Sequence, residues 1–245
     1  MLQGAPNFRP IAGLKSDTIY RSNELSELTD RDLDELKRLK IRTIIDLRTP
    51  NERKSQLDRI TSDLGIQQIS IPILQLNQDV GQFKLLSYLF QNAKTLDFQK
   101  YIKDFYTIIA YERTQQLKRT LTILADPNNV PAIIHCTVGK DRTGFIAALL
   151  QKLAKVPDEV IIEDYLKTNE LMKDHVKKFM RYLRFMSLYR ISKERMLPLF
   201  QVQDDYLKDI INDVEEKHQT IENYLLEVCQ IEKSKVETLK KIVTP

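Results

Sequence analysis

The residues best suited to chemistry lie in one run of ten positions, from His135 to Gly144, with the sequence HCTVGKDRTG. The whole chain of 245 residues holds only two cysteines, three histidines and six glycines. One of these cysteines, one histidine and two glycines fall within the run. An apolar segment typical of a strand precedes the run, and an apolar segment typical of a helix follows it. This concentration of scarce residues between two elements indicates a functional site.

The run lies where the predicted helix begins, and a helix N-terminus favours a bound anion through its unpaired N–H groups and its dipole. Gly139 permits the backbone dihedrals that turn such N–H groups inward as a nest. The planar fork of Arg142 can hold two oxygens of a tetrahedral oxyanion. Thiols in such positive fields ionise readily, because their pKa falls from about 8.5 to about 3.5–7.5. We therefore expect Cys136 to be a thiolate nucleophile beneath a bound phosphate.

A plainer interpretation is a buried structural cysteine at the end of a strand, beside a surface ion pair of Asp141 and Arg142. For an isolated cysteine this interpretation would prevail. Here it requires His, Cys, Gly, Lys, Asp, Arg, Thr and Gly to coincide within ten positions, between the correct flanking elements. The phosphate-site interpretation is therefore preferred.

The run resembles the signature of the cysteine-based phosphatases, HCx5R followed by Thr or Ser. It is more closely similar to HCxxGKDRTG, the form found in the bacterial branch of tyrosine and dual-specificity phosphatases, which includes mycobacterial and listerial secreted phosphatases. Pro10 and Ala12 stand where that branch has Asp and Gly. The resemblance covers almost the whole chain, because four other segments share it: NFRPIAG at 7–13 (NFRDLGG in the branch), YRS at 20–22, DLRT at 46–49 and DYLKTN at 164–169 (DYLxxN).

The resemblance implies a role for each residue of the run. Cys136 would attack phosphorus and form a phosphocysteine intermediate, and Arg142 would hold the phosphoryl oxygens through the charge-dispersed transition state. Thr143 would donate a hydrogen bond to the thiolate and ease its departure, and His135 would orient the loop from beneath. The backbone from Thr137 to Arg142 would also hold phosphoryl oxygens. The predicted phosphate-binding residues are therefore Thr137, Val138, Gly139, Lys140 and Thr143.

The departing alkoxide or phenoxide needs a proton, so the reaction requires a general acid. Asp141 lies on the phosphate-binding run itself and can be aimed at the bridging oxygen, and the resemblance favours it. Asp46, at the end of a predicted strand beside Arg48, is the other candidate. Its alternative role is a salt bridge that supports the loop. We expect Asp141 to be the acid, and geometry is needed to decide between the two.

Lys140 adds a second positive charge beside the expected phosphate. In related signatures a lysine here accompanies phosphoinositide or multiply phosphorylated substrates, so lipid phosphatase activity is one interpretation and a solvent-exposed lysine is the other.

Cys229 is expected to be a small buried apolar residue rather than a redox partner of Cys136. A basic stripe at helical spacing lies further along the chain and consists of Lys173, Lys177, Arg181 and Arg184. It is either the face of a helical lid for acidic substrates or lipid, or an ordinary solvated face. We favour the solvated face.

Strand and helix patterns alternate through the first half of the chain. Capping motifs at Thr29 and Thr49 each begin a helix. The alternation predicts an α/β fold with a central, mostly parallel sheet flanked by helices, a helix-rich C-terminal half and one domain over 1–245. The expected strands cover 18–21, 41–47, 66–72 and 130–134, and helical patterns cover 83–125, 143–154 and nearly everything downstream.

Composition limits the other functions. The chain is 42% hydrophobic and 29% charged, a soluble globular balance, and its net charge of +4 does not demand a nucleic-acid partner. The three histidines are dispersed and lack CxxC or HExxH spacing, so we expect no metal and no cofactor. The apolar run from Phe145 to Leu150 is far short of the roughly 20 residues of a membrane span. We expect a cytoplasmic protein, or a secreted one whose signal has been removed.

These observations predict a metal-independent phosphomonoester hydrolase that acts on phosphotyrosine, with phosphoserine, phosphothreonine or phosphoinositides as further substrates. Its partners would be phosphorylated proteins or phosphoinositides, with peripheral contact to lipid. The alternatives are a phosphatase of inositol polyphosphates or other small molecules, and a catalytically silent phosphate-binding module. A binder needs no nucleophile, so the presence of Cys136, Asp141 and Arg142 together argues against the silent module.

Overall fold

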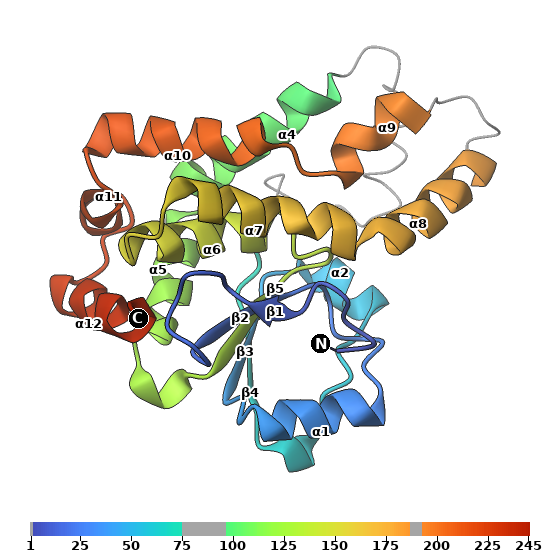
Figure 1. The fold of residues 1–245 in the computed structure, drawn as a ribbon, viewed down its shortest axis with the longest axis horizontal. Coiled ribbons are helices and arrows are strands. Elements are labelled where there is room, and N and C mark those ends of the chain that lie inside the picture. Colours follow the sequence, from blue (N-terminus) through green and yellow to red (C-terminus); the bar gives the residue numbers. More distant parts are fainter. Residues whose placement is uncertain (1, 75–96, 187–192) are drawn as a thin grey trace.

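A sheet of five short strands lies at the centre of the fold (Figure 1). The computed structural model describes residues 2–74, 97–186 and 193–245. The strands are β1 (Arg9–Pro10), β2 (Ile19–Ser22), β3 (Thr43–Asp46), β4 (Gln67–Ser70) and β5 (Ala132–His135). Their order is β1-β2-β5-β3-β4, with β1 antiparallel to β2 and every other pair parallel. The expected mostly parallel sheet is confirmed.

Helices flank this sheet and make up most of the C-terminal half, as predicted (Figure 1). A π-helical turn, Ile108–Glu112, interrupts the helical pattern predicted over 83–125, whose first part lies outside the described residues. Among the described helices, none is both long enough and apolar enough to cross a membrane. The helices before β5 are α1 (Asp30–Arg38), α2 (Pro50–Ser55), α4 (Phe98–Thr107) and α5 (Thr114–Leu124). Those after it are α6 (Asp141–Leu153), α7 (Asp158–Leu171), α8 (Lys173–Met186), α9 (Lys193–Phe200), α10 (Asp204–His218), α11 (Ile221–Glu227) and α12 (Lys233–Val243).

Two helices begin at the threonines that the sequence predicts. Thr29 Oγ1 accepts the N–H of Asp32, and the Asp32 carboxylate accepts the N–H of Thr29. Thr49 and Glu52 form the same reciprocal pair at the start of α2. Each capping box satisfies N–H groups that the helix itself leaves unpaired. The second box also fixes the position of Glu52 beside the loop that follows β5.

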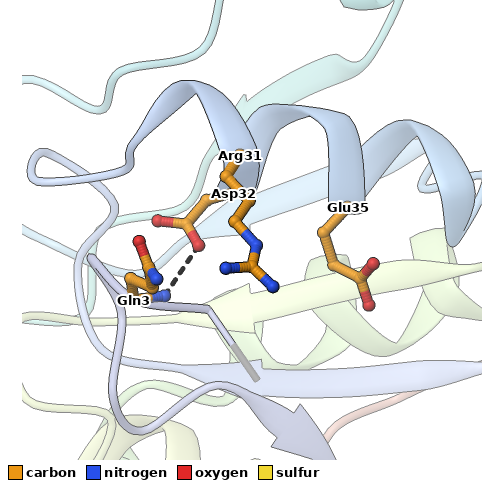
Figure 2. A pocket seen from close by; sticks show the side chains of 4 residues that line it. All are labelled: Gln3, Arg31, Asp32 and Glu35. Atoms are coloured by element: carbon orange, nitrogen blue, oxygen red, sulfur yellow. Dashed lines mark hydrogen bonds between the residues drawn. The ribbon is translucent and has the colours of Figure 1, made fainter.

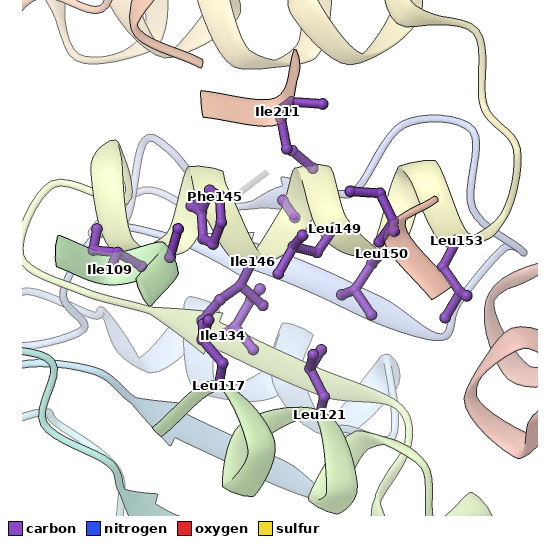
Figure 3. Packing of buried hydrophobic residues seen from close by; sticks show 14 of the residues in the cluster. Ile109, Leu117, Leu121, Ile134, Phe145, Ile146, Leu149, Leu150, Leu153 and Ile211 are labelled. Carbon is purple, nitrogen blue, oxygen red and sulfur yellow. The ribbon is translucent and has the colours of Figure 1, made fainter. Parts of the chain in front are cut away.

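Alternating side chains of the sheet contribute to two hydrophobic cores. Ile45 and Ile134 belong to the larger core, which includes α5, α6 and the C-terminal helices, whereas Ile44 and Ile133 belong to a smaller core with α1. Figure 3 shows α6 between the sheet and α10, with side chains of α5 packed nearby. The uninterrupted apolar run from Phe145 to Leu150 reflects this burial on every side of α6.

The parallel register brings the carboxyl ends of three strands to one edge of the sheet. His135 pairs in register with Asp46 of β3 and with Ser22 of β2. The chain leaves β5 at this edge and enters α6 at Asp141. Ligands of open α/β sheets bind outside the carboxyl ends of the strands. The sheet thus places the predicted phosphate loop where a ligand site is expected.

Candidate active site

Residues 136–140 form a loop between β5 and α6, and its shape depends on one glycine. Gly139 has a φ of +72°, and a Cβ at this position would lie 2.3 Å from the carbonyl oxygen of Ser22. Only glycine accepts both this left-handed backbone and this close approach. The conformation aims the N–H of Gly139 at Cys136 Sγ, at 3.2 Å. Cys136 itself is buried, so this N–H lies close to its sulfur inside the protein.

The carbonyl oxygens of the loop are tied to the N-terminal part of the chain. The contacts are Glu24 N to Thr137 O (3.2 Å), Asn7 Nδ2 to Val138 O (2.8 Å) and Gly139 O (3.2 Å), and Arg21 Nη2 to Gly139 O (2.9 Å). In a trans peptide unit, the N–H points away from the carbonyl that precedes it. The N–H groups therefore turn toward the side of Cys136, which is the arrangement of an anion-binding nest.

Two buried arginines share one carboxylate behind the loop. Arg9 Nε donates to Asp164 Oδ1 and Arg21 Nη1 donates to Asp164 Oδ2, each at 2.8 Å. Burial opposes ionisation of Asp164, but Arg21 and Arg9 more than offset it and lower its pKa. Burial and Arg21 lower the pKa of Arg9 to about 10. Asp164 and Arg9 are both charged at neutral pH, and the cluster holds the N-terminal segment and α7 against the loop.

Four residues of this support were not among those predicted for the site: Asn7, Arg9, Arg21 and Asp164. All four lie in the segments that resemble the bacterial phosphatase branch, and that resemblance is the signal that could have identified them. They are distant from the loop along the chain, with 118 positions between Arg21 and Gly139. The fold alone brings them together.

A carboxylate that the sequence predicts only as a helix cap holds Arg142. Arg142 Nη1 donates to Glu52 Oε2 at 2.7 Å and Nη2 donates to Oε1 at 2.8 Å, while Thr137 Oγ1 donates to Oε1 at 2.6 Å. Burial opposes ionisation of Glu52, but Arg142 and Thr137 bring its pKa down to about 2. Burial likewise opposes the charge of Arg142, and pairing with Glu52 raises its pKa overall. The fork of Arg142 is thus oriented by a bidentate pair.

Asp46 and Arg48 belong to a buried cluster beside His135. Arg48 Nε and Nη2 donate to the two oxygens of Asp46, each at 2.9 Å, and Nη2 also donates to Asp58 Oδ2 at 2.7 Å. His135 Nε2 lies 3.4 Å from Asp58 Oδ2 and 3.8 Å from Asp46 Oδ1. Burial opposes ionisation of Asp58, but His135 and Arg48 lower its pKa. Both oxygens of Asp46 are engaged with Arg48, which is the geometry of a supporting ion pair.

Asp46, Asp58 and His135 also offer one ligand atom each within 4.8 Å of one another, close enough to surround a metal ion. The guanidinium of Arg48 already contacts both carboxylates. Because a buried pair of negative charges needs a cation, and Arg48 supplies it, the proximity of the three side chains is explained by the protein's own charges.

Asp141 is the first residue of α6 and contacts Tyr106 and Lys140. Its Oδ1 accepts a hydrogen bond from the Tyr106 hydroxyl at 3.2 Å, and its Oδ2 lies 3.5 Å from Lys140 Nζ. The Asp141 side chain is 17% exposed, so a substrate can reach it. Lys140 is 3% exposed and donates to the carbonyl oxygen of Leu199 in α9 at 2.9 Å. The interpretation of Lys140 as a solvent-exposed lysine is therefore wrong, because α9 covers it.

One contact expected from the sequence is not formed. Thr143 Oγ1 is buried and makes no hydrogen bond with any residue that the structure describes, so it does not donate to the Cys136 thiolate. The sulfur accepts the N–H of Gly139 instead, because the positive φ of that residue turns its N–H toward the cysteine. Thr143 follows the loop into the buried first turn of α6.

The predicted basic stripe lies on α8, which continues from the end of α7 (Figure 1). Lys173, Lys177 and Arg181 are exposed on it, and the side chain of Arg184 lies outside the described residues. Both a lid for acidic substrates and an ordinary solvated face require such exposure. The lid therefore stays a prediction.

The second cysteine lies in the segment between α11 and α12. Cys229 is completely buried, and burial raises its pKa to about 12. A thiol with a raised pKa is seldom ionised and reacts slowly. Cys229 thus has the surroundings of a buried apolar residue.

Figure 2 shows a pocket on α1 that contains none of the loop residues; Gln3, Arg31, Asp32 and Glu35 line it. The Asp32 carboxylate accepts the N–H groups of Gln3 and Gly4, at 2.7 and 2.9 Å. Glu35 pairs with Arg38 through both of its oxygens. These carboxylates hold the N-terminal segment and the surface of α1, so the pocket has a structural explanation separate from the loop.

The chain is similar in sequence to known proteins over almost its whole length. Residues 1–244 match a family model described as the tyrosine phosphatase family. The chain is 29% identical over 191 residues to the triple specificity protein phosphatase PtpB of Mycobacterium tuberculosis, covering 69% of this chain and 68% of that protein. It is 32% identical over 83 residues to the inositol diphosphatase DSP1 of Oryza sativa subsp. japonica, covering 34% and 35%. Among solved structures, the core catalytic domain of the PP-IP phosphatase SIW14 from S. cerevisiae aligns with a TM-score of 0.38 and 20% identity, covering 84% of this chain and 91% of that one.

Proposed function

Because the chain belongs to the tyrosine phosphatase family, we propose that it removes phosphate from phosphotyrosine through Cys136, with residues 136–142 as the phosphate site. The geometry of the loop carries the proposal. Its carbonyl oxygens are tied outward, and the N–H of Gly139 is aimed at the Cys136 sulfur. Together with the N-terminus of α6, this arrangement favours a thiolate and a bound phosphate in the same place.

The first step transfers the phosphoryl group to the enzyme. The Cys136 thiolate attacks phosphorus, so a sulfur–phosphorus bond forms while the bond from phosphorus to the leaving oxygen breaks. The loop N–H groups and Arg142, oriented by Glu52, stabilise the charge on the phosphoryl oxygens. Protonated Asp141 gives its proton to the leaving oxygen, so tyrosine departs as a neutral phenol.

The second step releases phosphate. Water attacks phosphorus and the bond to sulfur breaks, while the carboxylate of Asp141 accepts a proton from that water. Inorganic phosphate leaves, and Cys136 and Asp141 return to their starting protonation states. Asp46, with both oxygens held by Arg48, supports the loop during both steps.

Lys140 supports a second substrate class, the phosphoinositides and inositol phosphates. Its ammonium group adds positive charge next to Asp141, and because α9 covers it, it would favour multiply phosphorylated substrates through this charge rather than by direct contact. The names of two similar proteins, a triple specificity phosphatase and an inositol diphosphatase, agree with a broad substrate range. The exposed Lys173, Lys177 and Arg181 of α8 would attract an anionic lipid surface.

A substrate panel tests the proposal. Phosphate release by the full chain is measured with tyrosine-phosphorylated and serine-phosphorylated peptides, phosphoinositide vesicles and soluble inositol polyphosphates. The variant Cys136→Ser serves as the inactive form, and Cys229→Ser is its matched control at the other buried cysteine.

The wild type and Cys229→Ser are expected to hydrolyse the phosphotyrosine peptide, and Cys136→Ser is not. Hydrolysis that survives in Cys136→Ser would refute the nucleophile. A kcat/KM for inositol phosphates or lipids that exceeds the peptide value by more than about 10-fold would make the second class the principal one.

A further inference from the structure

Two buried tyrosines from two other helices connect to Asp141. Tyr106 of α4 donates to Asp141 Oδ1 at 3.2 Å, and the hydroxyl of Tyr165 of α7 lies 2.6 Å from that of Tyr106. Tyr106 is 0% and Tyr165 1% exposed. No step of the reaction described above uses either hydroxyl, although they form a hydrogen-bonded chain that ends on the general acid.

The chemistry of the three groups fixes the direction of this chain. An ionised carboxylate only accepts hydrogen bonds, so Tyr106 donates to Asp141. The oxygen of Tyr106 then accepts from the hydroxyl of Tyr165. Burial, and after it Tyr165 and Asp141, raise the pKa of Tyr106 well above its ordinary value. Tyr106 therefore remains a neutral donor wherever the enzyme would be assayed.

We propose that Tyr106, backed by Tyr165, is a positioning residue for proton transfer from Asp141; this rests on the proposed role of Asp141 as the general acid. By binding Oδ1, Tyr106 restrains rotation of the carboxyl group. Oδ1 is then engaged by the Tyr106 hydroxyl, so the proton for the leaving group would be carried on Oδ2. A proton donor held in one orientation loses less entropy on reaching the transition state.

The test measures kcat/KM of the full chain for aryl phosphates that differ in the pKa of the leaving group. For leaving groups of high pKa, Tyr106→Phe is expected to lower kcat/KM about 10-fold, and for leaving groups of low pKa by less than about 2-fold. Tyr165→Phe should give the same pattern at a smaller size, because it removes only the second hydrogen bond.

Tyr224→Phe is the matched control, since Tyr224 is buried and its hydroxyl donates to the carbonyl oxygen of Ala110 rather than to the loop. It should leave the leaving-group dependence unchanged. Thermal unfolding checks that each variant folds. If Tyr106→Phe does not fold, the kinetic comparison is made with Tyr165→Phe instead.

Asp141→Asn separates failure of this proposal from failure of the proposed function. If Asp141→Asn slows all leaving groups equally, the acid lies elsewhere and both assignments fall. If Asp141→Asn shows the dependence but Tyr106→Phe does not, only the role of Tyr106 falls. The same conclusion follows if Tyr106→Phe slows the Asp141→Asn enzyme further, because a residue that acts through Asp141 has no effect without it.

Discussion

At the scale of single residues, Glu52 connects a helix cap to the phosphate site. Its two oxygens accept from both terminal nitrogens of Arg142, and Oε2 also accepts the N–H of Thr49. The bidentate geometry fixes the plane of the guanidinium as well as its position. The capping-box glutamate of α2 therefore sets how Arg142 faces the proposed phosphate site.

The variant Glu52→Gln tests this pairing through the dependence of stability on pH. The pKa of Glu52 is about 2 in the folded chain, against an ordinary value of 4.5. A lowered pKa stabilises the fold above the ordinary value, and this stabilisation is lost as the pH falls from 4.5 toward 2. The shift corresponds to about 3 kcal/mol at neutral pH. Urea unfolding measures the difference in the free energy of unfolding between wild type and variant, and this difference should narrow as the pH falls over this range. A difference that does not change with pH would contradict the pairing.

The two candidate acids differ in how their carboxylates are engaged, and the difference is measurable. Asp46→Asn weakens the pair with Arg48, so we expect it to slow hydrolysis evenly across leaving groups. Asp141→Asn removes the proton donor, so it should slow poor leaving groups most, by up to about 10²–10⁴-fold. Rates for a series of aryl phosphates, plotted against the pKa of the leaving group, give one slope for each variant. If only Asp46→Asn shows a dependence on the leaving group, Asp46 is the general acid and Asp141 the supporting residue.

At the scale of elements, β5, the loop and α6 act as one unit. The strand and the helix are buried, so the short loop between them has fixed ends. Gly139 bends the chain within that span, and Gly144 lets α6 approach α7, since a Cβ there would lie 3.1 Å from the ring of Tyr165. The phosphate site is therefore shaped by packing as much as by its polar groups.

Gly139→Ala tests this dependence on backbone shape. The new methyl group meets the carbonyl oxygen of Ser22 at 2.3 Å and strains a positive φ, so the loop must shift. We expect kcat/KM to fall by at least about 100-fold, because small misplacements of a catalytic loop have effects of this size. Gly65→Ala is the matched control, since Gly65 has a φ of +62° but open space around its added Cβ. Equal losses in the two variants would show that backbone strain alone, rather than loop geometry, is responsible.

The sequence predicts the elements that carry continuous patterns and misses those that do not. The buried strands around Ile44 and Ile133 appear as apolar runs, whereas β1 has only two residues and no period to detect. The π turn at 108–112 keeps the apolar spacing of a helix, so the break between α4 and α5 is invisible in the sequence.

The same division applies to the site. The loop is contiguous, so its residues could be predicted together. Glu52, Tyr106 and Asp164 reach the loop only through tertiary contacts, and Glu52 lies 90 positions from Arg142. Each of these residues has an adequate local explanation: Glu52 caps a helix, and Tyr106 and Asp164 are ordinary helical residues. The local explanation gives no sign of their contacts around the loop.

At the scale of the molecule, one buried carboxylate joins the N-terminal strands and α7 to the loop after β5. Asp164 on α7 pairs with Arg9 of β1 and Arg21 of β2, and Arg21 in turn holds the carbonyl oxygen of Gly139. Removing one partner from such a cluster leaves uncompensated buried charge, which costs far more than an exposed pair is worth.

Asp164→Asn is therefore expected to lower the free energy of unfolding by about 3–5 kcal/mol. Asp204→Asn, which breaks the exposed pair with Lys208, should change it by less than about 0.5 kcal/mol. Denaturant unfolding at neutral pH measures both values. A loss below about 1 kcal/mol in Asp164→Asn would show that the two arginines are solvated or paired differently from the structure.

The ties between the loop and distant segments also govern when activity arises as the chain is made. Asn7 and Val138 are 131 positions apart, and Arg21 and Asp164 are 143 apart. Contacts of such long sequence separation form late, because the entropy of closing the intervening chain must be overcome first. A ribosome that has just completed Cys136 has made the proposed nucleophile but not α7, whose Asp164 holds the arginines behind the loop. We therefore expect the thiol to be synthesised well before the contacts that shape its loop can form.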